Sequence, residues 1–368
     1  MTRSEKKKRY DGMLIFVVLL LVAAGLVILY STSAYNGQVK FHDSFHYLKK
    51  QGFATLLGLF GMALIARVDY HKWVPLAIPA YVTSIILSVA VIFFGDEYNG
   101  SKRWLSLGPI SFQPSEFAKV AVIFFLACLV SRNVQRMKRF RTMIFMMIPV
   151  LPIVGLVGAS NLSTAIIILG IAVVLIFVAD PKYVRFILMG SIGVGFMTVF
   201  LAMESYRLER LAIWRHPEQY EKGYQTLQGL YAIGSGGLFG RGLGNSVQKL
   251  GFLPEAQNDM IFSIICEELG LIGAGFIILL FLILIWRFFV ISTKASDLLG
   301  ALIAAGAMAH MMIQVILNIA VVTNSIPNTG ITLPFISYGG TSVVFLLLEM
   351  GLVLSVSNYE GLRYGGSE

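Results

Sequence analysis

Gly251 to Trp286 reads GFLPEAQNDMIFSIICEELGLIGAGFIILLFLILIW, a stretch in which acidic residues precede a long apolar run. The run from Leu269 to Trp286 is long enough for about 27 Å of helix, close to the thickness of a bilayer's hydrocarbon core. Four carboxylates lie on its N-terminal side: Glu255, Asp259, Glu267 and Glu268. The stretch therefore predicts a membrane-spanning helix with an acidic cluster near one membrane interface.

The composition of the whole chain supports a membrane protein. Hydrophobic residues make up 57% of the 368 residues and charged residues 13%, against roughly 25% charged in soluble domains. The net charge of +9 comes from Lys and Arg clusters between apolar runs, which indicates membrane topology rather than a nucleic-acid partner. The two cysteines, Cys128 and Cys266, lie in apolar context without metal-ligand spacing, so we expect them to be packing residues.

Apolar runs of about 17–25 residues predict an all-α polytopic membrane protein, one domain over residues 1–368. The first run follows the basic segment MTRSEKKKRYDG and is longer than a signal-peptide core of roughly 7–15 residues, so an uncleaved anchor is expected. Ten spans are expected, near 13–34, 52–66, 74–94, 116–131, 143–158, 162–179, 185–203, 260–286, 297–322 and 341–357.

The basic residues orient these spans. A cytoplasmic N-terminus keeps the RNVQRMKRFR loop at 132–141 inside, which the positive-inside bias favours. Both termini are then cytoplasmic. Three polar segments rich in Gly and Pro face outward on this topology: 95–115, the large loop 204–258 and 323–340. A functional site is expected on that outer face.

Asp259 has three interpretations, which periodicity does not separate. It or Asn258 could cap the following helix, it could belong to an ion-coupled pathway, or it could be a general base whose pKa is set by partial burial and neighbouring charges. Glu267 lies eight residues further on, about 80° of rotation and 12 Å of rise along a helix. The two carboxylates could share a cavity without touching.

Other polar groups lie within or beside the predicted spans. Glu116 and Lys119 share a helix face. They are either a structural ion pair or the polar wall of an outward-facing cavity. Lys102 and Arg103 either bind phosphate or lie at the membrane interface. The glycine-rich segment 231–250 is expected to fold back onto the membrane surface, and 326–342 to be a re-entrant element. Four residues of the last two spans are interhelical hydrogen-bonding groups or cavity lining: His310, Gln314, Asn318 and Glu349.

Three segments together resemble the shape, elongation, division and sporulation (SEDS) family. They are NGSKRWLSLGPISFQPSEFAK at 99–119, GYQTLQGLYAIGSGGLFGRGLGNSVQKLGFLPEAQNDMIFSIICEELGLIG at 223–273 and LPFISYGGTS at 333–342. The resemblance covers nearly the whole chain and is closer to the FtsW and SpoVE members than to RodA.

This resemblance implies a ten-helix peptidoglycan glycosyltransferase that uses lipid II on the outer face of the bacterial cytoplasmic membrane. The family's essential acidic residue, usually within Thr-Asp-Phe, corresponds to Asp259, here within Asn-Asp-Met. As a general base it would activate the acceptor 4-hydroxyl. Asn161 replaces an acidic residue that many members carry, so no charge-dependent role is expected of it.

The remaining site residues follow from the same resemblance. Arg103, Lys119, Arg210 or a divalent cation, Mg²⁺ or Mn²⁺, would stabilise the leaving diphosphate. Glu116 would orient Lys119, and Glu267 or Glu268 would hold a metal or a polar partner. The metal ligands stay unassigned. The other substrate-binding candidates are Glu255, Gln257, Asn258 and Ser337.

The resemblance also implies partners. A class B penicillin-binding protein is expected to crosslink the glycan, because this chain has no Ser-x-x-Lys transpeptidase domain. Other division proteins and membrane lipid are further expected partners. Two alternatives stay open, namely a lipid II flippase and a non-catalytic division scaffold.

Overall fold

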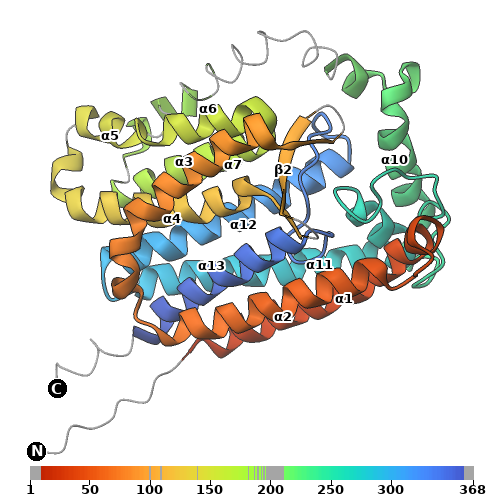
Figure 1. The fold of residues 1–368 in the computed structure, drawn as a ribbon, viewed down its shortest axis with the longest axis horizontal. Coiled ribbons are helices and arrows are strands. Elements are labelled where there is room, and N and C mark those ends of the chain that lie inside the picture. Colours follow the sequence, from red (N-terminus) through yellow and green to blue (C-terminus); the bar gives the residue numbers. More distant parts are fainter. Residues whose placement is uncertain are drawn as a thin grey trace, which may run out of the picture.

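The computed structural model describes residues 10–359 except 99–100, 108–109, 139, 181, 186, 189, 192, 194 and 196–210. Figure 1 shows long helices lying alongside one another in one bundle, with α10 at one end. The main helices are α1 (Gly12–Phe41), α2 (His46–Arg67), α3 (Ala77–Phe94), α4 (Pro114–Asn133), α5 (Phe140–Met147), α6 (Val150–Ser160), α7 (Leu162–Ala179), α10 (Tyr224–Gly236), α11 (Ile261–Lys294), α12 (Leu298–Val322) and α13 (Gly340–Tyr359). Short 3-10 helices include Tyr70–Leu76 before α3, Val134–Lys138 after α4, and Pro217–Gln219 and Glu221–Gly223 before α10.

The expected multi-pass membrane architecture is confirmed. Among the described residues, seven helices are long and apolar enough to cross a membrane, or eight if the bent pair of α5 and α6 counts as one span. The predicted span 52–66 falls within α2, which begins with a polar turn and is not among the seven. The predicted span 185–203 lies largely outside the described residues.

A small antiparallel sheet corrects the all-α prediction. It consists of β1 (Asp96–Tyr98), β2 (Ser101–Leu107) and β3 (Ile110–Phe112), in that order. This segment lacks the long apolar run of a spanning helix, so adjacent strands satisfy its backbone groups instead. The sheet connects α3 to α4 and carries Arg103 on its middle strand.

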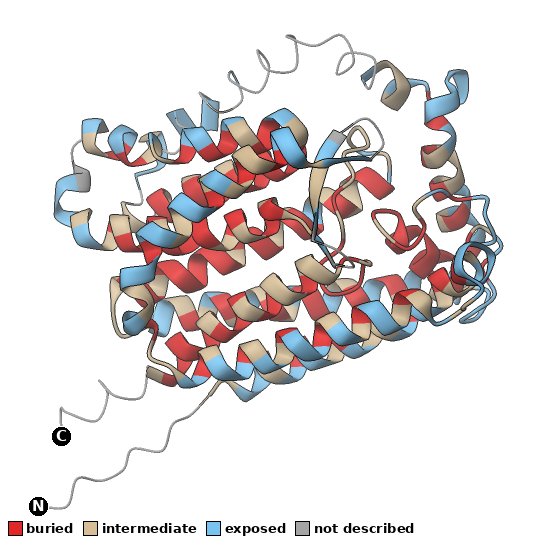
Figure 2. Ribbon diagram, viewed as in Figure 1, coloured by how far each residue is buried: buried red, intermediate tan, exposed pale blue. Residues whose placement is uncertain are grey.

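Close helix contacts depend on small residues. A Cβ at Gly58 of α2 would lie 2.7 Å from the Leu347 side chain of α13, and one at Gly351 of α13 would lie 2.8 Å from the Met62 carbonyl. Glycine at these positions allows the two helices to approach closely, as is common between membrane helices. In Figure 2 the buried faces of the helices point into the bundle.

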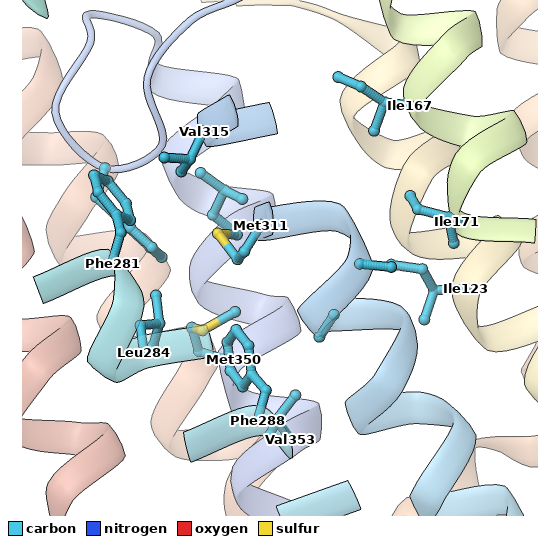
Figure 3. Packing of buried hydrophobic residues seen from close by; sticks show 14 of the residues in the cluster. Ile123, Ile167, Ile171, Phe281, Leu284, Phe288, Met311, Val315, Met350 and Val353 are labelled. Atoms are coloured by element: carbon cyan, nitrogen blue, oxygen red, sulfur yellow. The ribbon is translucent and has the colours of Figure 1, made fainter. Parts of the chain in front are cut away.

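A continuous cluster of apolar side chains fills much of the bundle interior. Figure 3 shows Phe281 and Leu284 of α11 near Met350 of α13 and Met311 of α12, while Ile123 of α4 lies toward α7. All of these side chains are buried. By contrast, residues facing away from the bundle are large and apolar, including Phe53, Leu56, Phe60, Phe276 and Leu279. The outer faces are thus suited to lipid.

Helix α11 is broken at Gly270, whose φ of 66° and ψ of −168° are not helical. The glycine-rich loop after α10 lies along this break, and the segment 231–250 begins as helix α10. Its expected place on the membrane surface stays a prediction. Backbone groups freed by the break are paired with the loop, as non-helical backbone at membrane depth requires. Four hydrogen bonds join them: Leu271 N to Gly237 O at 2.9 Å, Ile272 N to Leu238 O at 3.2 Å, Arg241 N to Glu267 O at 2.9 Å and Gly242 N to Glu268 O at 2.9 Å.

Between α12 and α13 the chain is irregular, and residues 331–339 are mostly buried. The re-entrant element expected at 326–342 stays a prediction. Phe335 packs against α1 so closely that a Cβ at Gly25 would lie 2.4 Å from the Phe335 carbonyl oxygen. Gln51 of α2 donates to the Ser337 carbonyl at 3.3 Å and accepts from the Gly339 N–H at 3.1 Å. Helices α1 and α2 therefore hold this segment inside the protein.

Candidate active site

Asp259 lies in the turn that immediately precedes α11, and only 8% of the residue is exposed. The N-cap of α11 is Met260, and no side chain caps that helix end. The capping interpretation of Asn258 or Asp259 is therefore wrong. The Asp259 carboxylate instead accepts a hydrogen bond of 3.4 Å from the Gln225 amide of α10, and Asn328 donates to the Gln225 oxygen at 3.2 Å.

Arg103 reaches the same place from the β-sheet. Its Nε donates to the Ser160 carbonyl at the end of α6, at 3.1 Å, which orients the guanidinium. A Cβ at Gly330 would lie 3.5 Å from Arg103 Nη1 and 3.8 Å from Asp259 Oδ2. Gly330 has a φ of 68°, a conformation that favours glycine. A cation and a carboxylate from distant parts of the chain therefore meet beside one glycine.

The surroundings raise the pKa of Asp259 to about 7. Burial is the main cause, and the negative charge of Glu255 adds to it, while the positive charge of Arg103 and backbone hydrogen bonds act in the opposite direction. Removing a carboxylate from water disfavours its ionised form. A base with a pKa near neutral is well matched to accept a proton at neutral pH.

The other predicted residues of this turn contact protein groups. Glu255 has a φ of 53° and receives a hydrogen bond from the Asn258 amide. The Gln257 side chain accepts from the Asn36 amide of α1 at 3.1 Å. Ser337 is buried, and its hydroxyl donates to the Asn258 carbonyl at 2.6 Å. These residues support the turn that carries Asp259.

Glu116 and Lys119 form a buried ion pair of 2.9 Å within α4. The Lys119 side chain is 1% exposed and also donates to the Gln314 oxygen of α12 at 2.9 Å. His310 Nε2 lies 2.9 Å from the same oxygen, and His310 Nδ1 lies 2.8 Å from Glu349 of α13. The interhelical interpretation of these polar residues is confirmed, and the Lys119 ammonium points into this network.

Glu267 and Glu268 bind the glycine-rich loop. Glu267 accepts from the Ser246 hydroxyl and, at 3.0 Å, from the Val247 N–H. Glu268 pairs with Lys249 at 2.6 Å and accepts from the Ser31 hydroxyl of α1 at 2.7 Å. Their partners are thus polar groups of the protein. Within the described residues, no group of three or more His, Cys, Asp or Glu side chains is arranged to hold a metal.

Three further predictions concern Arg210, Asn161 and the two cysteines. Arg210 lies outside the described residues. Asn161 caps α7, accepting from the Thr164 N–H at 3.2 Å, and both cysteines are buried as expected. Sequence reasoning missed Gln225 and Gly330 as neighbours of Asp259. Both lie in or next to the quoted motifs, but only the folded chain brings them to the carboxylate.

The fold and this site define a multi-pass membrane protein with a buried carboxylate at one end of its helix bundle. Residues 11–361 match the FtsW, RodA and SpoVE family, described as "Cell cycle protein". The chain belongs to this family.

Curated relatives cover almost the whole chain. Stage V sporulation protein E of Bacillus subtilis (strain 168) is 40% identical over 360 residues, covering 96% of this chain and 98% of the relative. A protein of Geobacter sp. (strain M18) named "Probable peptidoglycan glycosyltransferase FtsW" is 35% identical and covers 95% of this chain and 96% of its own length.

Solved structures show the same fold. One is described as "Structural coordination of polymerization and crosslinking by a peptidoglycan synthase complex". Its matching chain has a TM-score of 0.79 and 29% identity, with 95% of this chain and 98% of that chain covered. Thermus thermophilus RodA has a TM-score of 0.70 and 28% identity, with coverage of 95% and 96%.

Proposed function

We propose that this protein is a peptidoglycan glycosyltransferase that polymerises glycan strands from lipid II, with Asp259 as the general base. The observation that carries the proposal is the buried Asp259 carboxylate, with a pKa raised to about 7, close to Arg103 beside Gly330. Family membership supports it, because FtsW relatives carry the name peptidoglycan glycosyltransferase. The similarity to stage V sporulation protein E and FtsW supports a role in division or sporulation.

The reaction follows from the chemistry of the site. The acceptor 4-hydroxyl attacks the donor anomeric carbon, a C–O bond forms, the bond to the polyprenyl diphosphate breaks, and the hydroxyl proton passes to Asp259. Because an α-linked donor becomes a β-1,4 linkage, the displacement inverts and proceeds in line. A base on one side and a cation on the other are then needed. Arg103 is suited to the diphosphate, since guanidinium donors match phosphate oxygens.

A divalent cation, Mg²⁺ or Mn²⁺, belongs to the proposal as an ion that binds together with substrate. Mg²⁺ in such sites is usually held by one or two carboxylates and by substrate phosphates, and its protein ligands stay unassigned. Bound with substrate, the ion would offset negative charge on the diphosphate.

The proposed topology has ten spans, both termini in the cytoplasm and the active site on the outer face of the cytoplasmic membrane. The distribution of basic residues supports it. Asp259, Arg103 and Gly330 all lie in irregular or strand segments at one end of the bundle. The dense basic segment 132–141 begins at the C-terminal end of α4, and the N-terminal end of α4 follows the sheet that carries Arg103.

The proposal includes a class B penicillin-binding protein as partner, which supplies the crosslinking. The similarity to a chain of a peptidoglycan synthase complex that coordinates polymerisation and crosslinking supports it. A lipid II flippase and a non-catalytic scaffold are the competing functions.

The test is glycan polymerisation from purified lipid II in liposomes containing the cognate transpeptidase. Asp259→Asn should abolish polymer, whereas Asp43→Asn should leave it unchanged, because Asp43 is a partly exposed carboxylate of the α1–α2 loop that pairs with Lys49 of α2. Polymer from Asp259→Asn would exclude Asp259 as the base. No polymer from any variant, together with measurable lipid II translocation, would favour the flippase.

A further inference from the structure

Three consecutive carbonyl groups of the Asp259 turn accept hydrogen bonds from the C-terminal part of the chain. The Gln257 carbonyl accepts from the Tyr338 N–H at 2.9 Å. The Asn258 carbonyl accepts from the Ser337 hydroxyl at 2.6 Å, and the Asp259 carbonyl accepts from the Asn318 amide at 2.9 Å. We call this arrangement the carbonyl clamp. It holds the backbone of the turn and leaves the Asp259 carboxylate to face Arg103 and Gly330.

Asn318 joins the two sides of the site. Its Nδ2 also donates to the Ile331 carbonyl at 2.7 Å, and the residue is fully buried. The two N–H groups of one amide therefore donate to two carbonyls, that of Asp259 and that of Ile331, the residue after Gly330. A single rigid side chain sets the spacing between the carboxylate and the glycine beside which Arg103 lies.

One helical turn earlier, Gln314 extends this support. Its Nε2 donates to the Thr332 carbonyl at 3.1 Å, and its oxygen accepts from Lys119. Because the Gln314 oxygen can only accept, the contact of 2.9 Å with His310 is a hydrogen bond when His310 Nε2 carries a proton. These contacts hold the Gln314 amide in one orientation, so α12 supports two neighbouring carbonyls of the irregular segment.

The direction of the Ser337 bond is also determined. The Leu333 N–H donates to the Ser337 hydroxyl at 2.8 Å, and the Asn258 carbonyl can only accept, so the hydroxyl proton points to Asn258. Ser337 is 4% exposed. Its polar atom is committed to the backbone of the turn.

We propose that Asn318 and Ser337 are positioning residues that hold the Asp259 carboxylate in its buried place beside Arg103. The inference rests on the proposed function for the catalytic role of Asp259, but the placement of the carboxylate can be measured without activity. Loss of the clamp should let the turn move and admit water to Asp259. The charged neighbours of the carboxylate, Arg103 and Glu255, stay unchanged in the variants below.

The experiment uses the full chain in liposomes and two variants of unequal severity. Ser337→Ala removes one hydroxyl donor, and Asn318→Ala removes both amide donors. Thr323→Val is the control, because Thr323 is an exposed residue just after α12 whose hydroxyl bonds to the carbonyl of Ile319. Infrared difference spectra against Asp259→Asn isolate the carboxylic C=O band of Asp259, and its pH titration is followed beside the pH profile of polymerisation.

We expect the Asp259 titration midpoint and the acidic limb of the polymerisation profile to move to lower pH together, more in Asn318→Ala than in Ser337→Ala. The turnover number should fall about tenfold in Asn318→Ala, and Thr323→Val should match the wild type. Folded Ser337→Ala and Asn318→Ala with unmoved midpoints would overturn the proposal. If Asn318→Ala does not fold, Ser337→Ala decides alone.

The two proposals can fail separately. If Asp259→Asn still polymerises, the base assignment fails, yet a moved infrared midpoint in the clamp variants still supports the positioning. If Asp259→Asn is inactive and the midpoints do not move, the base assignment stands and the positioning role is wrong.

Discussion

Asp259 and the pair Glu267 and Glu268 lie within ten residues of one another, and all three are buried, yet their surroundings differ. Glu267 and Glu268 accept from hydroxyl, backbone and ammonium donors of the glycine-rich loop and α1. Asp259 accepts a long hydrogen bond from the Gln225 amide and backbone hydrogen bonds that only partly offset its burial, and its pKa is raised to about 7. Burial with matched donors makes a carboxylate structural, whereas burial with weaker compensation makes it a base.

The largest expected effect is a loss of stability when Glu268, one of the carboxylates with matched donors, is removed. Glu268→Ala leaves the Lys249 ammonium buried and unpaired, which costs about 3–5 kcal/mol of stability, because Glu268 and Lys249 are 2% and 7% exposed. Thermal unfolding in detergent measures the loss. The double variant Glu268→Ala with Lys249→Met should recover most of it, and no recovery would show that the ion pair does not hold the loop.

The next effect is a loss of polymerisation when Gly330, the glycine beside Asp259 and Arg103, is replaced. Gly330→Ala forces an alanine into a positive φ and places a Cβ 3.5 Å from Arg103 Nη1 and 3.8 Å from Asp259 Oδ2. Polymerisation should fall by roughly a hundredfold, the scale of a 1 Å misplacement in an active site. Gly155→Ala in α6, where a Cβ meets nothing within 4 Å, is the matched control. Equal activity of both variants would contradict the assigned site.

Stability should depend on pH through Asp259 in an unusual direction. The ordinary pKa of an aspartate side chain is 3.8, and the pKa of Asp259 in the folded protein is about 7, so between these values the folded protein binds more protons than the unfolded chain. Stability from this group is complete below pH 3.8 and is lost as the pH rises through 7. The wild-type melting temperature should therefore fall more from about pH 5 to about pH 8 than that of Asp259→Asn. Parallel curves would refute the raised pKa.

The smallest effect concerns Glu255. Its negative charge contributes to the raised pKa of Asp259, so Glu255→Gln should move the acidic limb of the polymerisation profile to lower pH. The turn itself should stay intact, since glutamine retains an oxygen that can accept from Asn258. A limb that moves to higher pH would mean that Glu255 acts on Asp259 by another route.

Sequence reasoning reached the membrane fold, because spanning helices need long apolar runs that are visible in one dimension. It also reached Asp259 and Arg103, through polar motifs at the ends of those runs. It missed the sheet at 96–112, whose short strands carry a weak periodic signal. The break at Gly270 was hidden too, since the apolar run continues through it and only the paired loop shows that the helix is interrupted.

By itself, the sequence determined the membrane class, the order of the motifs and the candidate base, because hydropathy and motif spacing are local properties of the chain. Tertiary structure alone decided which donors and charges surround each buried carboxylate. Lys249, Arg103, Gly330 and Asn318 reach their partners through long-range contacts. Several of these contacts end on backbone carbonyls, which every residue has, so they leave no residue-specific signal in the sequence.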